Sequence, residues 1–210
     1  MKHPLVVLLA LAFLLSIGCS THYVPTPFAA YSRTVSPPEG SYSPEVVPVY
    51  VDKSFAMDAR EDIHAALDEW NFAFNGYVTY VVVSDDFDME VAVLEKIVRT
   101  RQGLVVLSVP DNFLEDNVPP GVLAWVDDLG DPVVHIATGR IGTRDLKKIV
   151  MHEIGHTLGI PHTQAAFTLM SQYYQVQSAC IDEYTLHTLS GEDHAQAVHW
   201  DWHFMRSCRP

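Results

Sequence analysis

The stretch from Met151 to Met170, MHEIGHTLGIPHTQAAFTLM, decides the fold of this chain. It contains the pattern H-E-x-x-H-x-x-G-x-x-H, with fixed residues at positions 152, 153, 156, 159 and 162. On a helix, residues four apart lie about 40° apart round the axis and about 6 Å apart along it. His152 and His156 therefore project from one face and can bind a single metal ion.

The third histidine can reach the same ion only if the helix ends before it. In a continued helix, His162 would lie about 15 Å beyond His152 and roughly 80° away round the axis. Gly159 can adopt the left-handed conformation that ends helices, and Pro161 prevents the helix from resuming. We therefore expect the chain to turn back after Gly159 and to bring His162 beside the other two histidines.

Three protein ligands and a water are the arrangement of a catalytic zinc site. Glu153 directly follows the first histidine, so its carboxylate can reach a zinc-bound water without binding the metal itself. The pattern predicts Zn²⁺ bound by His152, His156 and His162, with Glu153 as the general base. For the HExxH part alone, a buried helix with two hydrogen-bonded histidines is the alternative.

The length, composition and net charge limit the classes to which this protein can belong. The chain has 210 residues, enough for one ordinary domain and a targeting segment, and 48% of them are hydrophobic. The formal net charge of -13 argues against nucleic acid and against an anionic membrane surface as partners, because both require a basic face.

The N-terminus has the features of an export signal. Residues 1–18 contain the apolar run Leu5–Leu15, which is too short to span a bilayer as a helix. The following Ser16-Ile17-Gly18-Cys19 resembles a bacterial lipobox, although Ser16 stands where Leu is usual. Lipidation of Cys19 would account for the odd number of cysteines and would anchor the chain to a membrane of the bacterial cell envelope. Cleavage by an ordinary signal peptidase, giving a secreted protein, is the alternative.

Two further regions follow. Residues 19–44 are rich in proline and predict a tether or a latency segment, and residues 45–210 form the folded domain. A helix is expected at 58–75 with Asp58 as its cap, and another after Thr143 carries the histidines. Residues 89–102 are either a short helix or a strand pair, and 111–121 form a loop. Strands are expected at 46–51, 77–83, 104–109, 122–126 and 133–137.

The sequence HEIGHTLGIPH, followed eight residues later by Met170, resembles the metzincin clan of zinc endopeptidases. The distance to the methionine and the residue Thr163 are most similar to the matrixin branch, where Ser is usual at that place. The resemblance implies an α+β, metzincin-like zincin fold. Its mixed twisted sheet is accompanied by an active-site helix and a C-terminal helix, which we place at 180–189.

The resemblance also implies supporting residues. Met170 would form a Met-turn beneath the metal, and Asp182 would support that turn. In related families, a tyrosine two residues after the methionine supports the transition state. Gln172 holds that place here, so Tyr173 and Tyr174 are the candidates for this role. The segment 171–178 would form a wall of the pocket for the residue that follows the scissile bond.

These observations predict a monomeric, zinc-dependent endopeptidase that cleaves extended peptides. A substrate can pair with the edge strand Val122–Val126 by β-addition. The alternative is a zinc-containing binding or structural lipoprotein with the same fold, but such a site has no need of Glu153 as a base. Export also favours a disulfide between Cys180 and Cys208. The aspartates at 127, 128 and 131 are interpreted as turn residues in preference to a calcium site.

Overall fold

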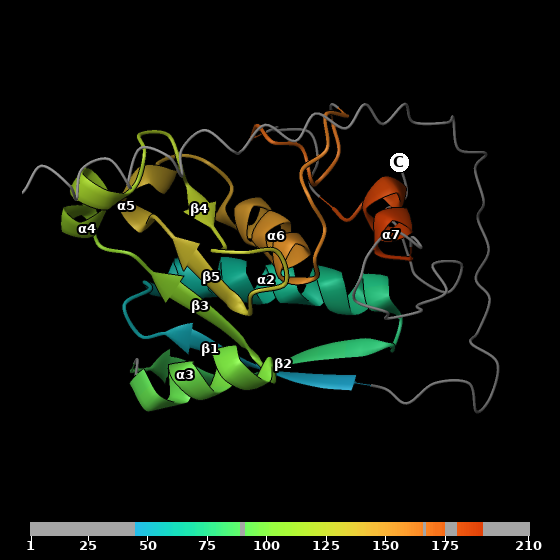
Figure 1. Cartoon of the computed structure of the whole chain (residues 1–210), viewed down its shortest axis with the longest axis horizontal. Helices are drawn as coiled ribbons and strands as arrows, with labels where there is room; N and C mark the ends of the chain where they lie inside the picture. Colours follow the sequence, from blue (N-terminus) through green and yellow to red (C-terminus); the bar gives the residue numbers. More distant parts are fainter. Residues whose placement is uncertain (1–44, 89–90, 166, 175–179, 191–210) are drawn as a thin grey trace, which may run out of the picture. The chain divides into compact units, whose positions relative to one another are not determined.

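The computed structural model describes residues 45–88, 91–165, 167–174 and 180–190 (Figure 1). The predicted signal peptide, the tether and Cys208 lie outside the described residues. In chain order the elements are β1 (Glu45–Asp52), α2 (Met57–Phe74), β2 (Val78–Phe87), α3 (Val91–Thr100), β3 (Leu104–Ser108), α4 (Asp111–Asn117), β4 (Ala124–Trp125), β5 (Val133–Ile136), α5 (Thr138–Ile141), α6 (Leu146–Thr157) and α7 (Glu183–Ser190).

The five strands form one mixed sheet in the order β2-β1-β3-β5-β4. Strands β2, β1, β3 and β5 are parallel. Strand β4 runs antiparallel to β5, with Ala124 opposite Ile136 and Trp125 opposite His135. This arrangement confirms the predicted α+β fold with a mixed sheet. The expected strand 122–126 is reduced to two residues at the edge of the sheet.

Helices cover both faces of the sheet, and the alternation of side chains along β3 assigns each face its layer. Leu104 and Val106 belong to the large core that also contains the buried residues of α2 and α6. Val105 and Leu107 point the other way and pack with Ile97 of α3. All four side chains are buried, as a central parallel strand requires.

Helix α6 is fixed against α2 by one buried aromatic residue. Trp70 is fully buried, and its indole N–H donates a 3.0 Å hydrogen bond to the backbone carbonyl of Met151. Because Met151 immediately precedes the first histidine, this bond sets the height of α6 over the sheet. Lys147 forms a second link to α2, an ion pair with Glu69 at 2.7 Å.

Both predicted N-caps were wrong. Helix α2 begins at Met57 with Ala56 at its N-cap, and Asp58 lies in its first turn. Helix α6 is capped by Asp145 and not by Thr143: a carboxylate oxygen of Asp145 accepts a 3.2 Å hydrogen bond from the backbone N–H of Lys148. Helix α6 starts at the buried residue Leu146, so its cap lies directly before the first contact with the core.

Two segments between the strands are helical. The ambiguous residues 89–102 contain α3, and the predicted loop 111–121 contains the seven-residue helix α4. Helix α4 presents a single buried apolar side chain, Leu114, which packs in a small cluster with Val109 and Ala137. One buried apolar side chain in seven residues produces no periodic signal, so the pattern of the sequence did not reveal this helix.

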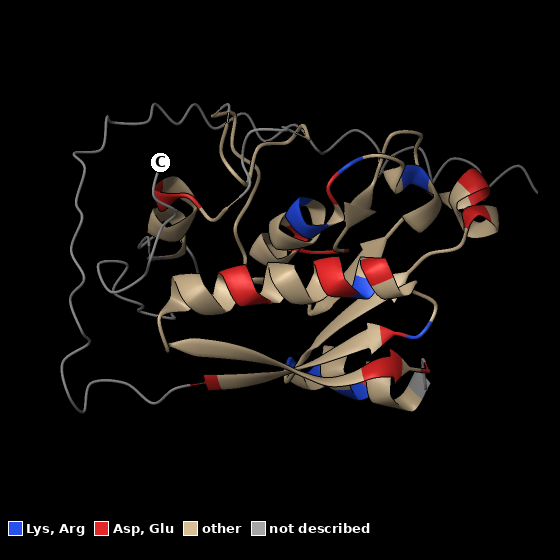
Figure 2. Cartoon of the chain, turned by 180° about the vertical axis from the view of Figure 1, so that it is seen from behind, with Lys and Arg blue, Asp and Glu red and all other residues tan. Residues whose placement is uncertain are grey.

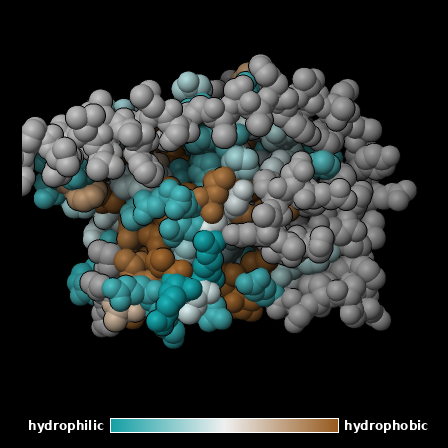
Figure 3. All heavy atoms as spheres, in the orientation of Figure 1, coloured by the Kyte–Doolittle hydropathy of each residue, from teal (hydrophilic) through white to brown (hydrophobic). Residues whose placement is uncertain are grey.

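The surface of the described domain agrees with the acidic composition. Acidic residues recur along α2, whereas the first turn of α6 is basic (Figure 2). On the face shown in Figure 3, hydrophobic and hydrophilic residues are interspersed. Within the described residues, no helix has both the length and the apolar character needed to cross a bilayer.

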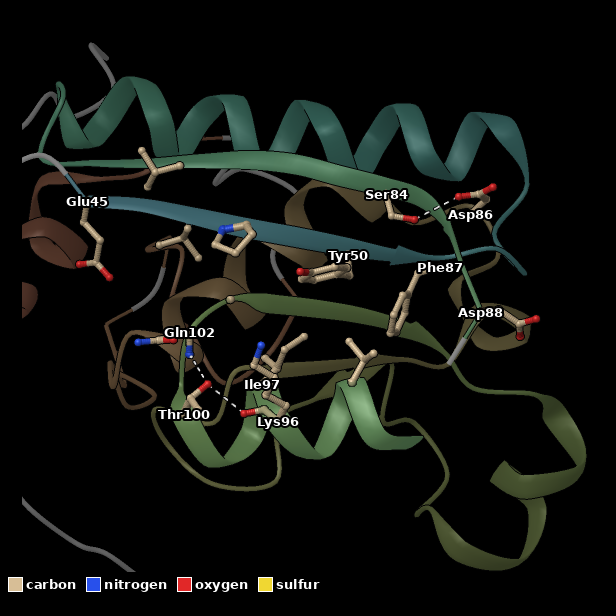
Figure 4. A pocket seen from close by; sticks show the side chains of 15 residues that line it. Glu45, Tyr50, Ser84, Asp86, Phe87, Asp88, Lys96, Ile97, Thr100 and Gln102 are labelled. Carbon is tan, nitrogen blue, oxygen red and sulfur yellow. Dashed lines mark hydrogen bonds between the residues drawn. The ribbon is translucent and has the colours of Figure 1, made fainter. Parts of the chain in front are cut away.

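A groove opens on the α3 side of the sheet (Figure 4). It is lined by residues of β1, β2 and α3, among them Tyr50, Phe87 and Ile97. Tyr50, Phe87 and Ile97 belong to or pack against the core between the sheet and α3. None of the predicted site residues lines the groove, because α6 and its histidines belong to the opposite layer.

Candidate metal centre

Helix α6 ends where the third histidine requires it to end. Gly159 has φ +86°, in the left-handed region, and its N–H donates to the carbonyl of His156 at 2.9 Å. The N–H of Ile160 donates to the carbonyl of Gly155 at 3.0 Å. These two bonds form a Schellman motif, in which a residue without Cβ reverses the chain at the helix C-terminus. The predicted turn at Gly159 is confirmed.

The turn brings the three histidines together. The Nε2 atom of His162 lies 3.1 Å from Nε2 of His156 and 3.2 Å from Nε2 of His152. Within the described residues, these histidines are the group of metal-ligating side chains whose ligand atoms lie close enough to share an ion. All three present the same ring nitrogen to one point, which is the arrangement of a three-histidine zinc site.

Backbone carbonyls fix the tautomers of two rings. Nδ1 of His152 lies 2.6 Å from the carbonyl oxygen of Leu169, and Nδ1 of His156 lies 2.7 Å from that of Ile160. A carbonyl oxygen only accepts, so Nδ1 must carry the proton in both rings. The Nε2 lone pairs are therefore left for a metal ion, and the rings are already oriented for it.

Burial keeps the histidines neutral. Desolvation is the main cause that lowers the pKa of His152 to about 3 and that of His156 to about 4. It also lowers the pKa of His162. Zinc binds the neutral form of imidazole, so these shifts remove protons as competitors for the site.

Glu153 is the buried carboxylate beside the histidines. Its side chain is 6% exposed, and among the described residues its Oε2 atom has no hydrogen-bond partner. Burial raises the pKa of Glu153 to about 8. A buried polar atom without a partner is costly, and a metal-bound water would satisfy it. Together with the three Nε2 atoms, this carboxylate shows that the residues present fit a catalytic zinc ion.

Met170 packs directly beneath α6. It is fully buried, and a Cβ atom placed on Gly155 would overlap its sulfur. Gly155 lies in the HExxH segment between Glu153 and His156, and only glycine leaves room for Met170 at that place. The sequence pattern leaves this position open, so the steric role of Gly155 emerged from the structure alone.

A chain of hydrogen bonds connects Asp182 to the ring of His152 through the backbone of Leu169. Asp182 accepts a 2.7 Å hydrogen bond from the backbone N–H of Leu169 through Oδ2, and the hydroxyl of Thr185 donates to the same oxygen at 2.9 Å. The carbonyl of Leu169 in turn accepts from His152. The contact of Asp182 with the segment before Met170 is the one that the sequence analysis expected.

The remaining candidate residues differ in their exposure and contacts. Tyr173 is exposed, whereas the hydroxyl of Tyr174 accepts a 2.9 Å hydrogen bond from the backbone N–H of Asp145, at the start of α6. Cys180 is disulfide-bonded. In the described part of the chain, the aspartates at 127, 128 and 131 do not gather into a metal site.

Comparison with known proteins identifies a family. The family model described as matrixin matches residues 52–194, which is more than half of the chain. The matched range includes the three histidines, Glu153 and Met170. None of the curated proteins matches the chain.

Burial holds the pKa of His152 at about 3 and that of His156 at about 4, and it also lowers the pKa of His162. Zinc binding should therefore depend little on pH in the range where imidazole usually titrates, and we expect the zinc dissociation constant to change less than about tenfold between pH 7.5 and 5.5. A histidine of ordinary pKa, about 6.5, would by itself cost about tenfold over this range. Competition with a chelating dye at the two pH values measures the constant, and a loss of a hundredfold or more would contradict the neutral state assigned to the rings.

Proposed function

The chain belongs to the matrixin family of zinc endopeptidases, and we propose that it hydrolyses extended peptides with Glu153 as the general base. The observation that supports this role most directly is the position of Glu153. It is a buried carboxylate, adjacent in sequence to a zinc ligand, with one oxygen that has no hydrogen-bond partner among the described residues.

The division of labour at the site follows from the geometry. His152, His156 and His162 hold Zn²⁺ through Nε2. When bound, zinc lowers the pKa of a coordinated water to about 7 and polarises the carbonyl of the scissile bond. Glu153 takes a proton from the attacking water and passes it to the leaving amine nitrogen. Burial raises the pKa of Glu153 in the chain without metal, and the positive charge of a bound zinc ion would lower it again and favour the carboxylate that accepts the proton.

The edge strand β4 offers a place for the substrate backbone. Strand β4 lies at the edge of the sheet, so one of its sides pairs with β5 and the other side has no neighbouring strand in the sheet. An extended peptide can add to its other side through backbone hydrogen bonds. The indole of Trp125 stacks on the ring of His135 at 4.9 Å and so stiffens this short strand. We infer that the enzyme binds its peptide substrate here and acts as a monomer.

Replacement of Glu153 tests the proposed base. Glu153→Gln keeps the shape of the side chain but removes its ability to accept a proton, so we expect kcat for casein or a fluorogenic peptide to fall by roughly 10²- to 10⁴-fold. Zinc content, measured on the same protein, should stay at one ion per chain. A chelator should abolish cleavage by the wild type.

Glu115→Gln is the matched control, because Glu115 lies exposed on α4. Its activity should equal that of the wild type. If Glu153→Gln cleaves as fast as the control while holding zinc, Glu153 is not the base.

Support of the transition state by Tyr173 or Tyr174 stays a prediction. The phenol of Tyr174 accepts a hydrogen bond at the start of α6 and keeps its own proton to donate, whereas Tyr173 is 72% exposed. If one of these tyrosines supports the transition state, its replacement by phenylalanine should lower kcat and leave KM unchanged, because the hydrogen bond would form only in the transition state. Equal kcat values for Tyr173→Phe, Tyr174→Phe and the wild type would remove both tyrosines from the mechanism.

We further propose that the chain is exported and anchored by a lipid on Cys19, with residues 1–18 as the signal peptide, 19–44 as the tether and 45–210 as the peptidase domain. The lipobox-like segment before Cys19 supports this arrangement. So does the disulfide at Cys180, since disulfides persist in oxidising compartments. We assign Cys208 as the partner of Cys180. Plain secretion is the alternative route.

Mass spectrometry of the mature protein from a bacterial host tests both assignments. We expect a diacylglyceryl group on an N-terminal Cys19 and, without reduction, a peptide that joins Cys180 to Cys208. Cys19→Ser should release the protein from the membrane fraction with unchanged peptidase activity. An unmodified N-terminus elsewhere in the segment 16–25 would contradict lipidation and favour secretion.

A further inference from the structure

The groove on the α3 side of the sheet is a surface for which the zinc site has no use (Figure 4). Its volume is about 960 Å³, and its floor includes Val46, Pro48 and Tyr50 of β1, which alternate with the β1 residues of the large core. Val46 is 64% exposed. Pro48 lies opposite Val81 of β2, which is 41% exposed, so the apolar surface continues onto the edge strand.

Helix α3 covers this face of the sheet only in part. Ile97 packs with Val105 and Leu107 of β3, and Phe87 at the end of β2 belongs to the same cluster. The described elements leave the first half of β1 and its neighbour β2 open on this side. An apolar sheet face is normally covered by a second layer, so this open half of the groove is suited to bind a further segment.

The charged side chains of the groove follow a fixed order along it. Glu45 lies at the end where β1 begins, Lys96 lies in the middle on α3, and Asp86 lies at the far end (Figure 4). Lys96 and Asp86 are exposed, and neither forms an ion pair among the described residues. An occupant with an acidic and then a basic residue, counted from the Glu45 end, would therefore match the groove.

The chain itself supplies such a sequence directly before the groove. Because Glu45 lines the groove, residues 32–44, SRTVSPPEGSYSP, are joined to one end of it. Counted back from Glu45, the charged residues of this segment are first Glu39 and then Arg33. An extended residue spans about 3.3 Å, and the segment is longer than β1, which has eight residues. It can therefore run back along the whole floor of the groove.

We propose that residues 32–44 reverse direction before β1 and bind in this groove as an extended segment. Glu39 then lies beside Lys96, and Arg33 lies beside Asp86, so each charge of the segment meets the opposite charge. The apolar residues between and beside these pairs cover the open half of the sheet face. The binding of the segment does not depend on the proposed peptidase function.

Two prolines and the covalent connection favour this binding. Pro37 and Pro38 hold the segment in an extended conformation, and proline-rich segments of this kind bind grooves that carry aromatic rings. Tyr50 and Phe87 provide such rings, with centroids 5.3 Å apart. Because the segment is attached to β1, its effective concentration at the groove is on the order of millimolar, and weak contacts suffice to hold it.

This location favours the role of a tether over that of a latency segment. Helix α6 and its histidines belong to the opposite layer, so a segment bound on the α3 side leaves the zinc site open. The export route then delivers a peptidase domain whose connection to the N-terminus runs over the face away from the substrate. This consequence rests on the proposed peptidase function.

Carbodiimide coupling of the full chain tests the proposed contacts. The reagent joins a lysine amine to a carboxylate where the two groups touch, so peptide mapping should find Lys96 joined to Glu39. The ion pair of Lys53 with Asp88, at 2.6 Å, is the internal control and should couple in the same sample. A mixture of isotopically light and heavy chains distinguishes a link within one chain from a link between two copies.

Trypsin cleavage after Arg33 measures the bound fraction, because the segment must leave the groove to be cut. We expect the full chain to be cut at least about tenfold more slowly than a synthetic peptide of residues 28–44. Val46→Asp places a charge in the groove at an exposed position and should raise the rate to that of the peptide. Met57→Asp is the matched control, because Met57 is 78% exposed on α2, in the other layer, and should leave the rate unchanged.

The outcomes separate the parts of this inference. If the control pair couples but Lys96 is not joined to Glu39, and Arg33 is cut at the rate of the peptide, the segment does not bind in the groove. A link found only between light and heavy chains would assign the groove to a second copy and overturn the proposal.

Casein cleavage by the same variants tests the role of the bound segment. The wild type and Val46→Asp should cleave casein at equal rates, because the groove lies away from the zinc site. Faster cleavage by Val46→Asp would make residues 32–44 a latency segment and overturn the tether role. If no variant cleaves casein, the proposed function fails, while the coupling and trypsin results still decide whether the segment binds.

Discussion

The zinc site depends on how α6 ends. The first two histidines need a helix to share a face, and the third needs that helix to stop within one turn. The Schellman motif at Gly159 satisfies both requirements, because its two hydrogen bonds complete the helix while the left-handed residue reverses the chain. The carbonyl of Ile160, freed by the reversal, then accepts from His156 and orients that ring. One local structure therefore places His162 and also fixes a tautomer.

Side chains from other elements of the fold position the rest of the zinc site. Trp70 holds α6 against α2 through the carbonyl of Met151, and Met170 packs beneath α6 where only glycine allows it. Asp182 connects α7 to Leu169, whose carbonyl orients His152. Elements far apart in the chain thus contact the same few ligands. Because these supports are buried and mutually dependent, the rings are held in the metal-binding geometry by the fold itself.

The parts of the site that were predictable from the sequence are those governed by short-range geometry. The spacing of His152 and His156, the break at Gly159 and the positions of the strands along the chain all follow from local periods and backbone preferences. The short helix α4 escaped prediction because Leu114 is its one buried side chain. The cap at Asp145 depends on where α6 meets the core. The burial of Lys148 was not predicted, since only the fold brings Tyr174 over it.

The electrostatics of α6 explain why a buried lysine is compatible with a zinc site. Burial keeps His152 neutral, so the free chain carries no second positive charge beside Lys148. A zinc ion adds positive charge one turn away, and a charge pair at that distance is only partly screened inside a protein. Two positive charges this close repel each other, so the neutrality of His152 and His156 limits the positive charge on this face of α6 to Lys148 and the bound ion.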